Sequence, residues 1–312
     1  FNINDWWFDK KNQMILNKFR KKFVRNSNNL YEDIGKLINQ NWKNFKLKKN
    51  VLVTGGSGFL GSHVADILTS KGYNVIIYDK KKSKWLKKKQ KFISGDISNL
   101  KKLKKIKGKI DYIYHFAALS DLDTALKNPL ESIKINILGT VNLLKFATQK
   151  KIKRFILAST IYVNSSQGSF YAASKKASEE YLREYNKLFK LKFTVLRFGS
   201  LYGERADKNN GLNKIINNSK KKGRVIFSGN KNTVREYINV KDAAKACLQI
   251  LNKRYENDHV LITGNNKIKI TNFLAYLKKK INSKKKIIIQ NKKIVGHYIK
   301  TPYTIKFYKG KK

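Results

Sequence analysis

The sequence of 312 residues contains one cysteine, two prolines and one methionine. Cys247 cannot form a disulfide within the chain, and no Cys/His cluster has the spacing of a zinc site, so we expect a reducing, cytoplasmic location and no bound metal. No run approaches the roughly 18 apolar residues of a membrane span, so we expect no membrane insertion. Residue 1 is Phe and the chain ends in a basic stretch at Lys312, so both ends are compatible with truncation.

Acidic residues are scarce: 20 Asp and Glu stand against 69 Lys and Arg, which gives a formal net charge of +49. Such a charge is typical of proteins that bind nucleic acid or anionic membranes. Only nine of the basic residues are Arg, the better ligand for phosphates and bases, and the other 60 are Lys. Because the abundant Lys, Asn and Ile share A/T-rich codons, we attribute the charge to coding bias and expect no nucleic-acid partner. A functional basic surface is the alternative.

From Val51 onward, short apolar runs alternate with segments of helical periodicity. Strands are expected at 51–54, 75–78, 91–93, 112–116, 154–158 and 193–198, with later ones at 259–263 and 287–290. Helices are expected near 60–70, 100–106, 130–149 and 171–188. This alternation predicts an α/β fold of the Rossmann type, a doubly wound parallel sheet with helices on both faces.

The expected organisation has three parts. Residues 1–48 show apolar side chains at helical spacing and form an N-terminal helical extension whose role the sequence does not specify. Residues 49–198 form the dinucleotide-binding domain, to which about 233–263 return. Residues 199–232 and 264–312 form a smaller C-terminal α/β lobe for the substrate, because the regular alternation weakens after Gly199.

Gly55, Gly58 and Gly61 have the spacing of a dinucleotide-binding loop, and they lie between an expected strand and an expected helix. The first glycine permits a tight turn, the second a close approach of the pyrophosphate, and the third close packing of helix on strand. The helix start, with Phe59 and Leu60, presents free N–H groups to the anion. The loop therefore predicts a bound dinucleotide.

Asp79, at the end of the second expected strand, indicates which dinucleotide is bound. A carboxylate at this place accepts hydrogen bonds from the adenosine ribose hydroxyls and repels a 2′-phosphate. We therefore expect NAD rather than NADP. Lys80, Lys81 and Lys82 lie beside it and leave tolerance of a phosphate open.

Tyr171 and Lys175 are four residues apart and so lie on one helix face. The spacing alone is weak evidence, because five of the 16 tyrosines have Lys at this distance. Tyr171, however, opens a helix after the fifth expected strand, where ligands bind in open α/β sheets. A neighbouring Lys charge lowers the pKa of a tyrosine, which would let Tyr171 act as a base. The same loop carries the hydroxyls of Ser159 and Thr160.

Seven motifs in order resemble the extended short-chain dehydrogenase/reductases, especially the NAD-dependent sugar-nucleotide epimerases and dehydratases such as UDP-glucose 4-epimerase. The resemblance covers about residues 50–265. Its carriers are Thr54-Gly-Gly-Ser-Gly-Phe-Leu-Gly61, Gly95-Asp-Ile97, His115-Phe-Ala-Ala118, Ala158-Ser-Thr160, Tyr171-Ala-Ala-Ser-Lys175, Leu196-Arg-Phe-Gly199 and Arg235-Glu-Tyr-Ile-Asn-Val-Lys-Asp242.

The resemblance implies roles at the cofactor. Asp96 and Ile97 would flank the adenine, and Ala117 and Ala118 would line the nicotinamide side. Asn136 matches a polar position that supports this part of the site.

The resemblance also implies roles at the reacting sugar. Thr160 would bind the sugar oxygen, and Tyr171 would take its proton while a hydride moves to NAD. Lys175 would hold the nicotinamide ribose and tune Tyr171.

Three further residues are expected at the substrate. Ser120 would contact it, and Arg235 would grip the nucleotide diphosphate with its guanidinium group. Arg205 would assist. A surface ion pair with Glu236 or Asp242 is the alternative for Arg235.

Departures from the family pattern narrow the activity. Dehydratases of the family carry acidic residues after the catalytic Ser or Thr, whereas Ile161 and Tyr162 follow Thr160 here. Ser200 and Glu204 stand where relatives carry Asn and Pro, which leaves the sugar and base contacts open.

We therefore expect an NAD-dependent epimerase that acts at C4 of a nucleotide-diphosphate sugar, as in polysaccharide biosynthesis. Such an enzyme is an isomerase that uses oxidoreductase chemistry, because the reaction passes through a 4-keto intermediate. The alternatives are a 4-ketosugar reductase or sugar-nucleotide dehydrogenase, and a non-catalytic protein that binds NAD or nucleic acid. By resemblance we expect a homodimer.

Overall fold

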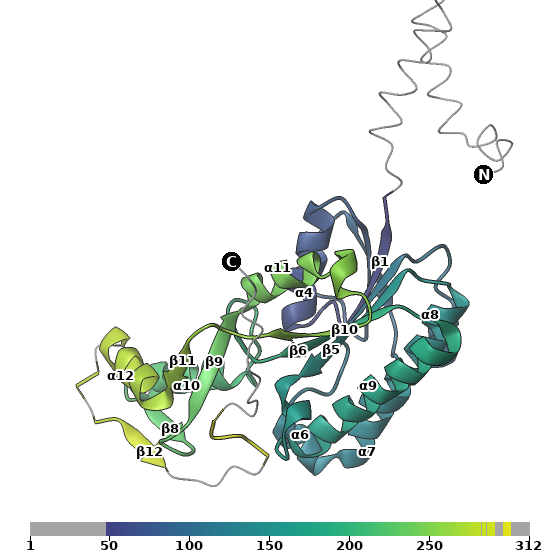
Figure 1. The fold of residues 1–312 in the computed structure, drawn as a ribbon. Coiled ribbons are helices and arrows are strands. Elements are labelled where there is room, and N and C mark those ends of the chain that lie inside the picture. Colours follow the sequence, from purple (N-terminus) through teal and green to yellow (C-terminus); the bar gives the residue numbers. More distant parts are fainter. Residues whose placement is uncertain (1–47, 282, 285, 291–295, 301–312) are drawn as a thin grey trace, which may run out of the picture. The chain divides into compact units, whose positions relative to one another are not determined.

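The computed structural model describes residues 48–300 except 282, 285 and 291–295, so the expected extension lies outside the described residues apart from Lys48. Its main feature is a seven-stranded parallel sheet in the order β10-β6-β5-β4-β1-β2-β3 (Figure 1). The strands are β1 (Asn50–Thr54), β2 (Asn74–Asp79), β3 (Gln90–Ser94), β4 (Tyr112–His115), β5 (Arg154–Thr160), β6 (Phe193–Phe198) and β10 (Asp258–Ile262). The strand order reverses between β1 and β4, as in doubly wound dinucleotide-binding sheets, which confirms the predicted fold class.

Helices cover both faces of this sheet (Figure 1). Successive side chains of a strand point to opposite faces, so Val51 and Val53 of β1 belong to one core cluster and Leu52 to the other. The first cluster includes α4 (Phe59–Ser70) and α11 (Val240–Gln249). The second includes α5 (Leu100–Lys104), α8 (Gly139–Gln149) and α9 (Ser169–Phe189). No helix within the described residues is long and apolar enough to cross a membrane.

The expected helix at 130–149 is present but is not uniform. It runs as α7 (Pro129–Ser132), a π-helical segment η1 (Ile133–Leu138) and α8 without a break. A short helix, α6 (Leu122–Lys127), precedes it. Wider π turns inside α-helices are often found at functional sites, and this one contains Asn136.

The C-terminal part has more regular structure than the sequence pattern indicated. Strand β9 (Val234–Asn239) pairs with β7 (Ser200–Tyr202) and β11 (Lys267–Lys269), and β8 (Ile226–Ser228) pairs with β12 (Ile288–Gln290). The helices α10 (Gly211–Lys222) and α12 (Ile270–Lys280) flank them. A 3-10 turn, η3 (Lys253–Tyr255), precedes β10. Strand β12 matches the strand expected at 287–290. The helices α10 and α12 escaped prediction because Lys and Asn occupy several of their positions and obscure the helical period, and β7, β8 and β11 because each has only three residues.

Within the segment 233–263, which was expected to return to the dinucleotide-binding domain, β10 joins the large sheet and α11 packs beside α4. Strand β9, in contrast, belongs to the three-stranded sheet.

Candidate active site

A cleft of about 2130 Å³ lies at the carboxyl ends of the parallel strands. Residues that follow β1, β2, β4, β5 and β6 form one wall, and α10, β8, β9 and residues 296–300 contribute the other. Open α/β sheets bind ligands at this edge, where the strand order reverses. The cleft is therefore the candidate active site.

The glycine loop forms the floor of the cleft at the end of β1. Gly55 has a φ of +69°, and a Cβ there would lie 2.5 Å from the backbone nitrogen of Ala117. A Cβ on Gly61 would collide with the carbonyl oxygen of Gly55. Helix α4 begins after Gly58, and Phe59 and Leu60 line the cleft with the three glycines. Because the first N–H groups of a helix have no partner within it, this end can accept a pyrophosphate.

Asp79 lines the cleft at the end of β2. Its Oδ2 accepts a hydrogen bond from the backbone nitrogen of Ser57 over 3.0 Å, which fixes the carboxylate beside the glycine loop. Lys80, which left tolerance of NADP open, pairs with Asp96 at 2.9 Å. Asp96 itself is not among the cleft-lining residues, whereas Ile97 is. The Asp96 carboxylate is turned toward Lys80 and Ser98, and the adenine contacts of Asp96 and Ile97 stay predictions.

Thr160, Tyr171 and Lys175 all line the cleft. Thr160 ends β5, and Tyr171 lies in the first turn of α9 and shares a side-chain hydrogen bond with Thr160. Lys175 is buried one turn further along, and its Nζ donates a hydrogen bond to the carbonyl oxygen of Ala158 over 2.8 Å. The sequence therefore correctly placed these three residues together.

The electrostatics differ from the sequence-based expectation. Burial raises the pKa of Tyr171 to about 12, and the hydrogen bond with Thr160 opposes this only in part. Burial lowers the pKa of Lys175 to about 8, while the charge of Glu179 acts in the opposite direction. The predicted lowering of the Tyr171 pKa by Lys175 is thus wrong for the free protein, because removal of water from the phenol is the larger effect.

Asn136 supports the site from behind and does not line the cleft. Its side-chain amide accepts from the backbone nitrogen of Leu119 over 2.7 Å and donates to the Leu119 carbonyl oxygen over 3.0 Å. It also donates to Ser174 of α9 over 2.9 Å. Asn136 thereby links three segments: η1, α9 and the loop after β4. This loop carries Ala117, Ala118 and Ser120, all of which line the cleft.

Arg235 of β9 lines the cleft on the side of the smaller lobe. Its guanidinium carbon lies 3.9 Å from the centre of the Tyr298 ring, and Nη1 donates to the carbonyl oxygens of Val234 and Ile299 over 3.0 and 3.4 Å. Asp242, one of the alternative ion-pair partners, pairs with Lys245 at 3.0 Å. The guanidinium group is therefore placed where it can meet an anionic part of a ligand.

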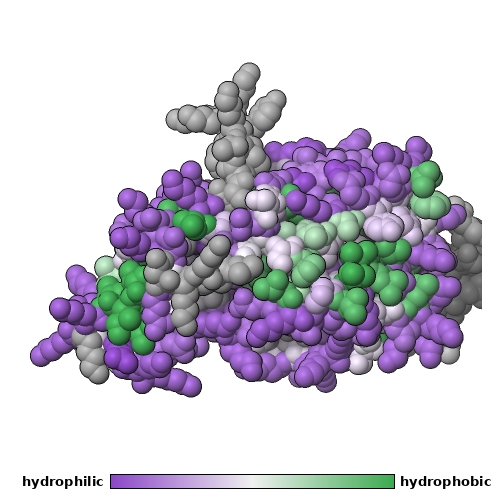
Figure 2. All heavy atoms as spheres, turned by 90° about the horizontal axis from the view of Figure 1, so that it is seen from below, coloured by the Kyte–Doolittle hydropathy of each residue, from purple (hydrophilic) through white to green (hydrophobic). Residues whose placement is uncertain are grey.

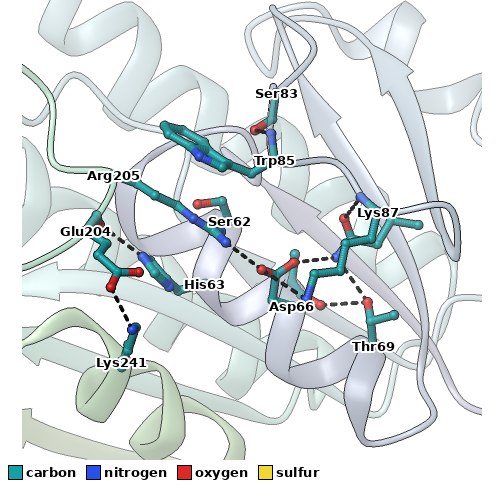
Figure 3. A network of polar contacts seen from close by, with 12 residues as sticks. Ser62, His63, Asp66, Thr69, Ser83, Trp85, Lys87, Glu204, Arg205 and Lys241 are labelled. Atoms are coloured by element: carbon teal, nitrogen blue, oxygen red, sulfur yellow. Dashed lines mark hydrogen bonds and ion pairs between the residues drawn. The ribbon is translucent and has the colours of Figure 1, made fainter.

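Arg205 occupies a different place from the one expected (Figure 3). Its Nη2 donates to Asp66 of α4 over 2.8 Å, and its guanidinium carbon lies 5.3 Å from the centre of the Trp85 ring. Asp66 also pairs with Lys87 at 3.4 Å. Arg205 does not line the cleft. The expected substrate contact is corrected to a link between the β7–α10 connection and α4, because Asp66 and Trp85 hold this side chain.

Two residues at the site, Tyr298 and Glu179, were missed by the sequence analysis. Tyr298 packs against Tyr162 at 4.9 Å between ring centres and against Arg235, but no motif marks it. Glu179 pairs with Arg197 behind Lys175. A signal for Glu179 was present, because it follows Lys175 by four residues on the same helix.

The chain is similar to known proteins in sequence and in fold. The profile of the "NAD dependent epimerase/dehydratase family" matches residues 51–263. A "Putative UDP-glucose 4-epimerase" of Methanocaldococcus jannaschii is 31% identical over 66% of this chain and 74% of its own length. The crystal structure of a UDP-glucose 4-epimerase from Thermotoga maritima with UDP-glucose has a TM-score of 0.75 and 27% identity, and the match covers 81% of this chain and 88% of that one. A Thermus thermophilus UDP-glucose 4-epimerase in complex with NAD has a TM-score of 0.72 and 25% identity, covering 81% and 89%.

Proposed function

Because this chain belongs to the NAD-dependent epimerase/dehydratase family, we propose that it epimerises a nucleotide-diphosphate sugar at C4 with NAD as resident cofactor. The observation that carries the proposal is the convergence of Thr160, Tyr171 and Lys175 on one cleft beside the glycine loop. The residues present fit the cofactor: a Cβ-free turn at Gly55, an open helix start, and a carboxylate at Asp79. When bound, NAD accepts a hydride from the sugar carbon and returns it.

The protein's own side chains supply the proton chemistry. Tyr171, with Thr160 as its hydrogen-bond partner, takes the proton of the sugar hydroxyl and returns it when the hydroxyl forms again. Lys175 holds the nicotinamide ribose, and its positive charge favours the phenolate over the neutral phenol. Because the pKa of Lys175 is about 8, this charge is present at neutral pH.

Epimerisation fits better than dehydration of the sugar. Elimination of water needs an acid and a base beside the oxidised carbon. At the two positions after Thr160, Ile161 is buried and Tyr162 packs on Tyr298. Burial also raises the pKa of Tyr162. These side chains cannot replace a carboxylate as the second base.

The substrate's diphosphate is assigned to Arg235, and Ser120 is assigned to the sugar. Arg235 faces the cleft from β9 with Tyr298 stacked on it. A guanidinium group can donate two parallel hydrogen bonds to a phosphate. Ser120 lies in the loop after β4 and lines the same cleft.

We further propose a homodimer and a reducing, cytoplasmic location. Figure 2 shows hydrophobic side chains gathered on the face seen from below, on the side where Figure 1 places α7 and α9. Leu130 is 79% exposed and Leu188 is 70% exposed. Other exposed apolar side chains are Ile133 and Leu138 of η1 and Tyr181 and Phe189 of α9. Such a surface on two packed helices suits a second copy of the chain. The reducing compartment is supported by the free, buried thiol of Cys247.

One experiment tests the function. Protein purified without added cofactor is denatured, and the released nucleotides are identified by mass spectrometry. The intact protein is then incubated with UDP-glucose, UDP-N-acetylglucosamine and UDP-glucuronate, and C4 epimers are detected by NMR. We expect near-stoichiometric NAD and conversion without net NADH formation. Stoichiometric turnover of added NAD(H) would instead show a dehydrogenase or reductase, and an empty protein that binds no NAD would refute the proposal.

A further inference from the structure

A buried carboxylate lies behind the catalytic residues. Glu179 of α9 is 2% exposed, and its Oε1 accepts a hydrogen bond of 2.5 Å from the hydroxyl of Ser159. Arg197 of β6 donates to both carboxylate oxygens, over 3.1 and 2.6 Å. His259 of β10 lies 3.7 Å from Oε2. One side chain therefore connects α9 to three neighbouring strands.

The contact with Ser159 is the middle one of three between the end of β5 and α9. Residues 158, 159 and 160 follow one another along the strand and contact Lys175, Glu179 and Tyr171, respectively. The helix residues are spaced by four, so all three lie on the helix face that packs on the strand end. The position of α9 against β5 sets the contact between Tyr171 and Thr160, and the Glu179–Ser159 contact is the last of the three along the helix.

We propose that Glu179 is a positioning residue for the site: it fixes α9 on the end of β5 and places a negative charge behind Lys175. This inference deepens the proposed function and rests on it. A misplacement of reacting groups by about 1 Å can cost on the order of 100-fold in rate. An anion near a buried ammonium group favours the charged form that burial disfavours.

The groups around Lys175 determine what the charge of Glu179 can do. Glu179 of α9 and His115 of β4 interact electrostatically with Lys175, and Tyr171 precedes it by one turn of α9. Arg197 of β6 and His259 of β10 face Glu179. Burial lowers the pKa of His115 to about 3 and lowers that of His259, so both rings are neutral at alkaline pH. Glu179 is therefore the neighbour through which α9 can act on the charge of Lys175.

Glu179→Gln removes the charge and keeps the size of the side chain. Its matched control is Glu180→Gln, because Glu180 is the next residue, has a 64% exposed side chain and pairs with Arg183 on the surface. Both variants are compared with the unaltered protein between pH 6.5 and 9.5. The readouts are the affinity for NADH by calorimetry, kcat and KM with UDP-glucose or the panel substrate that is converted, and the melting temperature.

We expect the alkaline fall of both NADH affinity and kcat to move about one pH unit lower in Glu179→Gln, because Lys175 loses its proton earlier. At a pH above the new midpoint this corresponds to a loss of up to about tenfold. KM changes less than twofold, and Glu180→Gln behaves as the unaltered protein. Equal profiles for the two variants, or a lower melting temperature with an unmoved alkaline limb, would overturn the proposal.

Ser159→Ala separates positioning from charge and also serves if Glu179→Gln does not fold. It removes the hydrogen bond of 2.5 Å but leaves the Glu179–Arg197 pair. We expect kcat to fall about tenfold with the alkaline limb in place, and an unchanged kcat would refute the positioning role. If the unaltered protein binds NADH but converts no sugar nucleotide, the proposed function fails, and the NADH profiles still test the charge of Glu179.

Discussion

Lys175 and Ala158 are joined by a hydrogen bond of 2.8 Å from the ammonium nitrogen to the carbonyl oxygen. The ammonium group is thereby held at the end of β5, one turn along α9 from Tyr171. Lys175 is 3% exposed, so the bond replaces water around the charge. Burial lowers the pKa of Lys175 to about 8.

The stability of the cofactor-free protein should depend on pH through Lys175. The pKa of Lys175 is about 8 in the folded protein and 10.5 for a lysine in the unfolded chain. Between these pH values the unfolded chain binds more protons, so stability rises with pH. Below pH 8 the buried charge costs about 3 kcal/mol, an order-of-magnitude value from the shift. Lys175→Met, which removes this charge, should therefore gain stability relative to the unaltered protein at pH 7, and the gain should shrink toward pH 10.

Urea unfolding at pH 7, 8.5 and 10 measures this difference. Lys176→Met is the control, because Lys176 is exposed and adjacent. A Lys175→Met difference that stays constant with pH would contradict the lowered pKa.

Tyr171→Phe should abolish epimerisation, with kcat at least about 1000-fold lower, because general acid–base catalysis contributes about 100- to 10,000-fold. NADH affinity should change less than threefold, since the glycine loop and Asp79 are untouched. Tyr181→Phe on the same helix is the control, because Tyr181 is 47% exposed. Turnover retained by Tyr171→Phe would remove this phenol from the mechanism.

Asp79 should select NAD over NADP by about 100-fold in affinity, because its carboxylate repels a 2′-phosphate. Asp79→Asn keeps an oxygen for the Ser57 N–H and removes the charge, so the preference should fall below about tenfold. Calorimetry with both dinucleotides measures it, with the exposed Asp242→Asn as control. Equal affinity of the unaltered protein for NAD and NADP would show that the remaining lysines at 81 and 82 outweigh Asp79.

The two arginines should respond in opposite ways to replacement by alanine. Arg235→Ala should raise KM for the sugar nucleotide by about 10- to 100-fold, the range of a charged hydrogen bond. Arg205→Ala should leave KM within twofold and lower the free energy of unfolding by about 1–3 kcal/mol, because Asp66 loses a partner while partly buried. Steady-state kinetics and urea unfolding of both variants measure this, and the reverse pattern would restore Arg205 to the substrate.

The exposed apolar helix face should form the dimer contact. Leu130→Glu combined with Ile133→Glu places two charges on this face and should give a monomer in sedimentation velocity, whereas the unaltered chain sediments as a dimer. Tyr276→Glu on α12 is the control, because Tyr276 is 60% exposed but lies on the smaller lobe. A monomeric unaltered chain would refute the dimer.

Much of the dinucleotide-binding half was predictable because its determinants are local. The apolar run at Val51, the glycines at 55, 58 and 61, and the helix that follows specify a strand, a turn and a helix within a few residues. Tyr171 and Lys175 were found in the same way, since a spacing of four places them on one helix face.

Tertiary structure alone decided the contacts between distant segments. The sequence predicts Arg235 as the ligand of the diphosphate and Arg205 as its assistant, but Asp66, 139 positions from Arg205, accepts a hydrogen bond from the Arg205 side chain. The raised pKa of Tyr171 likewise depends on burial, which exists only in the folded chain. Local residue spacing thus determined which groups lie on one face, whereas burial and long-range pairing decided which of them face the cleft and carry charge. Burial and long-range pairing depend on how distant segments pack together, and the local sequence pattern does not predict that packing.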